Sequence, residues 1–241
     1  MNSPPTAKSH LLLGARDTIP MIVGAIPFGI IFGALGVVSG LSPLATMGMS
    51  LFVFAGSAQF VAVGLVAQGA GIAIIVLTTF VVNLRHALYS ASLAPHLHYL
   101  SQRWLLPLGF WLTDETYAVV INRYRSHADD PHKHWYYLGS ALAMYGNWQI
   151  CTAVGIVAGQ NLQGMAEWGL EFAMVVTFIG IVVPMLVNRP MLLCALASGV
   201  VALWLRDLPH QLGLIVGSVA GLMVGLLFSA KRREPNVEEG A

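Results

Sequence analysis

Long runs of apolar residues constrain this chain of 241 residues more than any other feature, because they leave few folds open to it. Hydrophobic side chains make up 56% of the residues and charged ones only 10%, far from the balance of a soluble domain. A bilayer core about 30 Å thick is crossed by about 20 apolar residues in an α-helix, which satisfies its own backbone hydrogen bonds. The sequence therefore predicts an all-α, polytopic integral membrane protein.

Hydropathy predicts seven to eight transmembrane helices in a single domain over residues 1–241, with short polar cytoplasmic tails at 1–15 and 231–241. If eight spans alternate from a cytoplasmic N-terminus, nine basic residues fall inside and two outside. This excess on the inner side predicts that both termini are cytoplasmic. The predicted spans are 18–39, 43–67, 72–94, 104–122, 135–159, 169–187, 190–206 and 211–230.

Several function classes are disfavoured by what the sequence lacks. The net charge of +1 argues against a nucleic-acid partner. No G-x-x-x-x-G-K-[ST] motif occurs, so the chain is not predicted to hydrolyse ATP, and no cofactor is predicted. The histidines His127, His132 and His134 are spaced as in a hydrophilic loop rather than as a ligand set, so no metal site is predicted either.

Two of the predicted helices contain residues that weaken helical continuity. Pro27 removes a backbone hydrogen bond and favours a kink or break in the first helix. In the second helix the segment Phe54–Phe60 places Gly56, Ser57 and Gln59 between bulky aromatic residues. A break at Gly56 would point the free N–H groups of the following helix into the membrane, where they could bind a carboxylate. The alternative is close helix packing in which Gln59 forms a hydrogen bond across an interface.

Ionisable residues inside the apolar runs predict a functional site. The third helix carries Asn83, Arg85 and His86, and a central arginine costs about 2.5–3.5 kcal/mol even on the most lenient insertion scale. Asp114 and Glu115 in the fourth helix are the natural counter-charges. We expect one of these carboxylates to pair with Arg85 at a substrate or proton site; the alternative is a pair that only fixes helix packing.

Four motifs in this order resemble the AzlC family of branched-chain amino acid permeases: Pro27–Gly29, Phe54–Phe60, Asn83–His86 and Thr113–Glu115. The resemblance implies a bacterial inner-membrane exporter of valine, leucine, isoleucine or similar amino acids that works with a small AzlD-type membrane subunit. The missing nucleotide site favours secondary transport. The candidate substrate-binding residues are Pro27, Gly56, Ser57, Gln59, Asn83, Arg85 and His86, and the candidate proton or charge-pair residues are Arg85, Asp114 and Glu115.

Other classes of function remain as alternatives at this stage. The polar residues could line an ion channel or pack a membrane scaffold that transports nothing. An intramembrane enzyme could use Ser57 as nucleophile and His86 as base, but neither G-x-S-x-G nor H-E-x-x-H accompanies them, and the chain is not predicted to be an enzyme. Solute flux that saturates would distinguish a transporter from an open pore.

Overall fold

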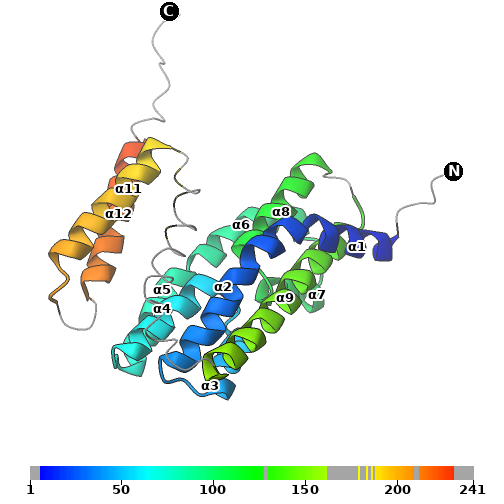
Figure 1. Ribbon diagram of the computed structural model, residues 1–241. Coiled ribbons are helices and arrows are strands. Elements are labelled where there is room, and N and C mark those ends of the chain that lie inside the picture. Colours follow the sequence, from blue (N-terminus) through cyan, green and yellow to red (C-terminus); the bar gives the residue numbers. More distant parts are fainter. Residues whose placement is uncertain are drawn as a thin grey trace, which may run out of the picture. The chain divides into compact units, whose positions relative to one another are not determined.

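The computed structural model describes residues 6–127, 130–161, 188–208 and 212–230, with the single positions 179, 183 and 186, and its main elements are helices (Figure 1). Contacts divide the chain into two compact units, residues 1–174 and 175–241. The described helices of the first unit are α1 (Ala7–Asp17), α2 (Ile19–Val38), α3 (Pro43–Phe52), α4 (Gly56–Ala67), α5 (Ile72–Asn83), α6 (Arg85–Leu97), α7 (Gln102–Phe110), α8 (Asp114–Ser126) and α9 (Lys133–Asn161). Those of the second unit are α11 (Arg189–Trp204) and α12 (Leu212–Ala230).

Short polar side chains set where several of these helices begin. Thr6 and Ser9 form a reciprocal capping box at the start of α1. The hydroxyl of Ser42 caps α3 and that of Thr113 caps α8, while the side-chain oxygen of Asn188 caps α11. Each of these oxygens accepts a backbone N–H that has no partner within its own helix, so each helix start is fixed locally.

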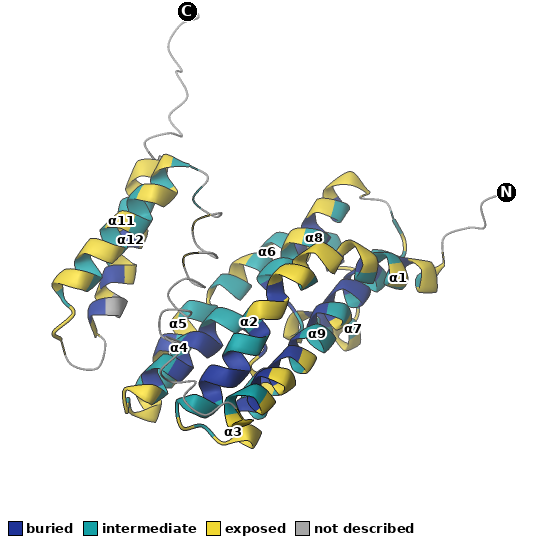
Figure 2. Ribbon diagram, viewed as in Figure 1, coloured by how far each residue is buried: buried dark blue, intermediate teal, exposed yellow. Residues whose placement is uncertain are grey.

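The long helix α9 is the centre of the first unit, because α1, α2, α3, α7 and α8 all pack on it. Glycines allow this close approach. A Cβ atom at Gly155 of α9 would overlap the carbonyl oxygen of Ile30, and one at Gly33 of α2 would overlap that of Thr152. Figure 2 shows buried residues on the sides of α2 and α9 that face each other and exposed residues on their outer sides. Small residues at the contact thus let the two backbones touch.

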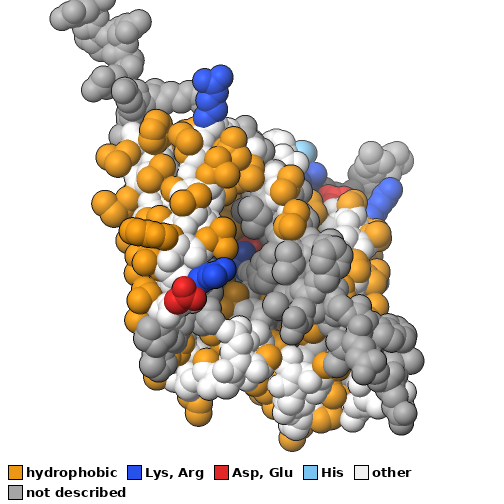
Figure 3. All heavy atoms as spheres, turned by 60° about the vertical axis from the view of Figure 1, so that its left-hand side comes forward, with side chains coloured by type: hydrophobic (Ala, Val, Ile, Leu, Met, Phe, Trp, Pro, Cys, Tyr) orange, Lys and Arg blue, Asp and Glu red, His pale blue; other side chains and the backbone are white. Residues whose placement is uncertain are grey.

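The outer surface of the helices is strongly apolar. Leu88 of α6 is 72% exposed and Ile150 of α9 is 67% exposed, and hydrophobic side chains dominate the face seen in Figure 3. Among the described helices, α2, the span Ile72–Leu97 formed by α5 with α6, and α9 are long and apolar enough to cross a membrane. A bilayer accounts for this surface, because lipid tails solvate apolar side chains that water would not.

In the second unit, α11 and α12 form a hairpin. The glycines of α12 lie against α11: a Cβ atom at Gly217 would come 2.8 Å from the carbonyl oxygen of Ser198, and one at Gly221 would overlap the Ser198 hydroxyl. The glycine stripe of the last helix is therefore an internal contact.

Most predicted spans correspond to observed helices, with three differences. The interruption predicted at Pro27 is wrong, because α2 is continuous through Pro27, whose side chain is exposed. The single helix predicted over 104–122 is also wrong, since the chain leaves helical geometry between α7 and α8. Residues predicted only as a polar tail form α1, which buries His10 and Gly14. The predicted span 169–187 and the tail 231–241 lie outside the described residues, apart from three positions in the span, and the single domain stays a prediction.

The contact of α2 with α9 predicts opposite effects of one methyl group at two glycines of α9. Gly155→Ala forces the backbones apart and should destabilise the protein by about 1–3 kcal/mol. Gly146→Ala is the matched control, because a Cβ atom there meets nothing within 4 Å and alanine favours the helix. Thermal unfolding of the two purified variants in detergent measures the difference; equal midpoints would contradict this account of the packing.

Candidate functional site

A break between α3 and α4 interrupts the span predicted over 43–67, and the predicted interruption at Gly56 is confirmed because α4 begins there. The break leaves the carbonyl groups of Ser50 and Leu51 at the end of α3 without helical partners, and Gln149 and Tyr145 donate to them at 3.0 Å and 3.1 Å. The carbonyl of Met49 accepts a helical bond from the N–H of Val53 and a second bond of 2.9 Å from Gln59. Because two of these donors come from α9, the central helix holds the break in place.

Gln59 is occupied on both sides by these structural contacts. Its amide N–H donates to α3, and its oxygen Oε1 accepts a hydrogen bond of 3.0 Å from the indole N–H of Trp148. The side chain has no exposed surface. This geometry supports the packing alternative for Gln59 rather than a direct contact with substrate.

No described side chain caps the start of α4. Its N-cap residue, Ala55, has extended geometry, and the N–H groups of the first turn donate to none of the described side chains. Gly56 is required here by the neighbouring helix, since a Cβ atom would lie 2.9 Å from the Trp148 ring. The N-terminal end of the helix dipole adds a partial positive charge at this point.

A second break, over residues 111–113, separates α7 from α8, and it was not predicted. The sequence did contain its signal: Thr113 caps α8, and Asp114 and Glu115 occupy the first turn, where carboxylates stabilise a helix N-terminus. The regular helical pattern is also interrupted at Leu84, which keeps right-handed helical geometry and after which α6 begins with Arg85. Helices α4, α6 and α8 therefore all start with residues that the sequence marked as functional.

Arg85 connects the three helix starts. Its Nη1 donates to Oδ2 of Asp114 at 2.5 Å, and its Nη2 donates to the hydroxyl of Ser57. The Arg85 and Asp114 side chains are 24% and 30% exposed, so the pair is largely shielded. Ser57, Arg85 and Asp114 are far apart in the sequence, and the structure brings them together.

Three atoms of this cluster remain without a hydrogen-bond partner in the described part of the chain although they are buried: Oδ1 of Asn83, Nε of Arg85 and Oδ1 of Asp114. A buried polar group without a partner costs about 1–3 kcal/mol, so such atoms favour binding a polar ligand. His86 lies beside them and bonds the carbonyl of Asn83 through Nδ1 (3.0 Å). Since that carbonyl only accepts, Nδ1 is the protonated nitrogen of His86.

The other candidates take different positions. Glu115 follows Asp114 in the first turn of α8, but the described ion pair of Arg85 is with Asp114. Pro27 is exposed on α2, and no described polar contact joins it to Arg85. Phe60 packs against Phe32 with ring centroids 6.0 Å apart.

Aromatic side chains join the two breaks. Tyr145 of α9 contacts Phe54 in the first break, with ring centroids 4.9 Å apart, and Trp111 in the second, at 5.9 Å. The indole N–H of Trp111 is buried without a described partner. Trp111 and Tyr145 were not predicted, because single aromatic residues in apolar helices carry no distinguishing signal in the sequence. They give the polar cluster an apolar border.

The cluster therefore combines features that suit a zwitterion. Arg85, the Ser57 hydroxyl and the N–H groups at the start of α4, which no described side chain caps, are donors that suit a carboxylate. The spare oxygens of Asn83 and Asp114 are acceptors that suit an ammonium group. The aromatic border can accommodate an apolar side chain.

Comparisons with known proteins agree on one family. The family described as AzlC protein matches residues 20–162. The chain is 27% identical to inner membrane protein YgaZ of Escherichia coli K12, over 93% of both chains, and 32% identical to an uncharacterized membrane protein of Archaeoglobus fulgidus, over 90% of this chain and 92% of that one. It is 28% identical to the branched-chain amino acid transport protein AzlC of Bacillus subtilis, over 67% and 62%. No solved structure matches the chain.

The two bonds of Gln59 predict a specific result for Gln59→Leu. The carbonyl of Met49 keeps its bond from Val53, but the indole N–H of Trp148 loses its acceptor, so stability should fall by about 1–3 kcal/mol. Gln102→Leu is the control, since Gln102 is exposed at the start of α7. Thermal unfolding and solute affinity are measured together. A variant that unfolded like the wild type but bound solute more weakly would place Gln59 at the substrate instead.

Proposed function

Because this chain belongs to the AzlC family of membrane transport proteins, we propose that it is a secondary transporter that exports branched-chain amino acids across the cytoplasmic membrane. Valine, leucine and isoleucine are the branched-chain amino acids, the class that the name of the Bacillus subtilis relative gives as its substrates. The export direction rests on the resemblance of the four motifs to the family.

The observation that carries the proposal is the half-buried pair of Arg85 and Asp114, whose spare polar atoms have no partner in the described chain. A pair that served only to pack helices would be expected to use all its hydrogen-bonding groups, because each unused one costs stability. Neither Nε of Arg85 nor Oδ1 of Asp114 has a hydrogen-bond partner among the described residues. A bound zwitterion would satisfy both.

The proposed binding mode follows from the positions of these groups. The substrate carboxylate binds at the N-terminus of α4 with Arg85 and Ser57, and its ammonium group binds Asp114 and Asn83. The branched side chain lies toward Phe54 and Trp111. Each charge-assisted hydrogen bond contributes about 1.5–3 kcal/mol, so the loss of one lowers affinity about tenfold or more.

A proton gradient is the proposed source of energy. Protonation of Asp114 would remove the charge that holds Arg85, and protonation of Asp114 or of the neighbouring Glu115 would bias the equilibrium between inward-open and outward-open states. Valine efflux that did not respond to the proton gradient would contradict this coupling. We also propose that a small AzlD-type membrane subunit works with the chain, which rests on the family resemblance.

The decisive experiment follows the release of labelled valine, leucine, isoleucine and methionine from cells loaded with dipeptides. The chain is expressed alone and beside an AzlD-type subunit. We expect wild-type efflux to saturate, and Arg85→Gln or Asp114→Asn to reduce it at least about tenfold, because each removes a charge-assisted contact. Arg206→Gln and Asp207→Asn are matched controls: they make the same changes in an ion pair whose side chains are 75% and 90% exposed.

A double variant, Arg85→Gln with Asp114→Asn, separates function from packing. It removes both charges together, so neither is left unpaired in the membrane. If the pair only packs helices, the double variant should recover the efflux that each single variant loses. The proposal requires that its membrane abundance recover while efflux stays low.

A further inference from the structure

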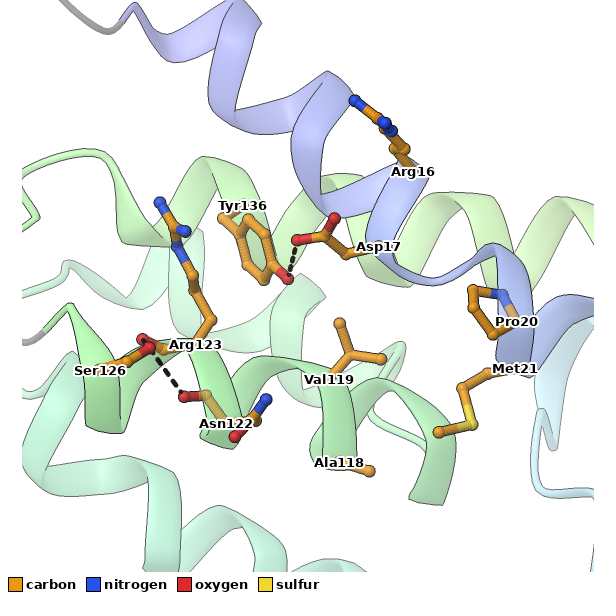
Figure 4. A pocket seen from close by; sticks show the side chains of 10 residues that line it. All are labelled: Arg16, Asp17, Pro20, Met21, Ala118, Val119, Asn122, Arg123, Ser126 and Tyr136. Carbon is orange, nitrogen blue, oxygen red and sulfur yellow. Dashed lines mark hydrogen bonds between the residues drawn. The ribbon is translucent and has the colours of Figure 1, made fainter.

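A cavity of about 550 Å³ lies between the α1–α2 connection and helix α8, with Tyr136 of α9 at its back (Figure 4). This volume is in the range of small-molecule sites. The residues of the Arg85 cluster do not line it. Among its lining residues are Asp17, Met21, Val119, Asn122, Arg123 and Tyr136.

The cavity combines opposite charges with an apolar wall. Figure 4 shows Arg123 and Asp17 on either side of the Tyr136 ring, and Met21 and Val119 on the neighbouring wall. One oxygen of Asp17, Oδ2, accepts a hydrogen bond of 2.8 Å from the Tyr136 hydroxyl. Its other oxygen has no partner in the described chain, so it can accept a bond from an ammonium group.

Arg123 can still bind a ligand carboxylate, although the carboxylate of Asp130 lies nearby. Its Nη2 lies 3.8 Å from Asp130, but His10 binds the same Asp130 oxygen at 2.7 Å. Burial by itself raises the pKa of Asp130, yet hydrogen bonds from the backbone of His132 and from His10 lower it overall, so Asp130 is a carboxylate at neutral pH. Nε of Arg123 is buried and has no described partner. A ligand carboxylate can accept a hydrogen bond from the Nε side of the Arg123 guanidinium.

Helix α8 connects this cavity to the Arg85 cluster. Asp114, Ala118 and Asn122 follow at steps of four, and each step shifts the position by only about 40° around the helix, so they lie on neighbouring parts of one face. Ala118 and Asn122 line the cavity, and Asp114 pairs with Arg85. Each step rises about 6 Å, so the near end of the cavity at Ala118 lies about one turn from Asp114, and Arg123 lies about two and a half turns from it.

We propose that this cavity is a second binding site for a zwitterionic solute with an apolar side chain, on the path to the Arg85–Asp114 site. We call it the outer site because it lies toward the C-terminal end of α8, and we call the Arg85–Asp114 site at the start of α8 the inner site. Arg123 binds the carboxylate, Asp17 binds the ammonium group, and Met21 and Val119 contact the side chain. The inference rests on the proposed transport function, because it assumes that the inner site takes the same class of solute.

The test uses a single cysteine in the cavity of the full-length protein. Asn122→Cys is made after Cys151→Ala and Cys194→Ala, and the purified protein reacts with a methanethiosulfonate reagent with and without leucine. At leucine near twice its dissociation constant the reaction should be about threefold slower, because one third of the sites remain free. Arg125→Cys is the matched control: it is exposed on α8 outside the cavity, and leucine should not change its rate.

Two added substitutions decide the interpretation. Arg123→Gln should abolish the protection of Asn122→Cys, whereas Asp114→Asn should leave it, since the outer site binds without the inner one. No protection by leucine, or protection lost with Asp114→Asn, would overturn the outer site. Protection that persists while wild-type cells export no branched-chain amino acid would refute the proposed function and leave the outer site standing.

Discussion

Backbone groups that are freed inside an apolar layer must find partners, and the architecture of the first unit depends on how this is done at the α3–α4 break. Neither water nor lipid can satisfy the last carbonyls of α3 in a membrane. Tyr145 and Gln149 donate to the freed carbonyls of Leu51 and Ser50, and Gln59 adds a second bond to the carbonyl of Met49. Two of these side chains belong to α9, which also packs against α2 through glycines. The helix that organises the packing is thus the one that makes an interrupted span possible.

The carbonyl end and the N–H end of this break differ in their side-chain partners, and this difference makes the cluster more positive near α4. The carbonyls at the end of α3 accept bonds from side chains, whereas no described side chain caps the N–H end of α4. The partial positive charge of α4 therefore adds to the full charge of Arg85, which pairs with Asp114 among the described carboxylates. The added positive charge near Ser57 favours the binding of one more anionic group.

Periodic and compositional features were predictable from the sequence, and contact-dependent features were not. The apolar runs located the helices because the cost of unsatisfied backbone in lipid dominates every other term. Arg85 and Asp114 were found because ionisable residues are rare in such runs. The break predicted at Pro27 is absent because a proline side chain on the exposed face of α2 is tolerated within a continuous helix. The roles of Tyr145 and Gln149 depend on which helix packs against the break, and this tertiary contact cannot be read from the sequence.

Charge balance explains why such a cluster would select zwitterions. Arg85 and Asp114 together carry no net charge, and the binding of a zwitterion keeps the sum at zero while it supplies a partner for each spare atom. A solute with an additional cationic or anionic group would leave one charge unpaired among apolar side chains, which costs several kcal/mol. An apolar solute without charges would leave the spare atoms as they are. Selectivity for neutral amino acids over charged ones thus needs no further residue beyond the pair itself.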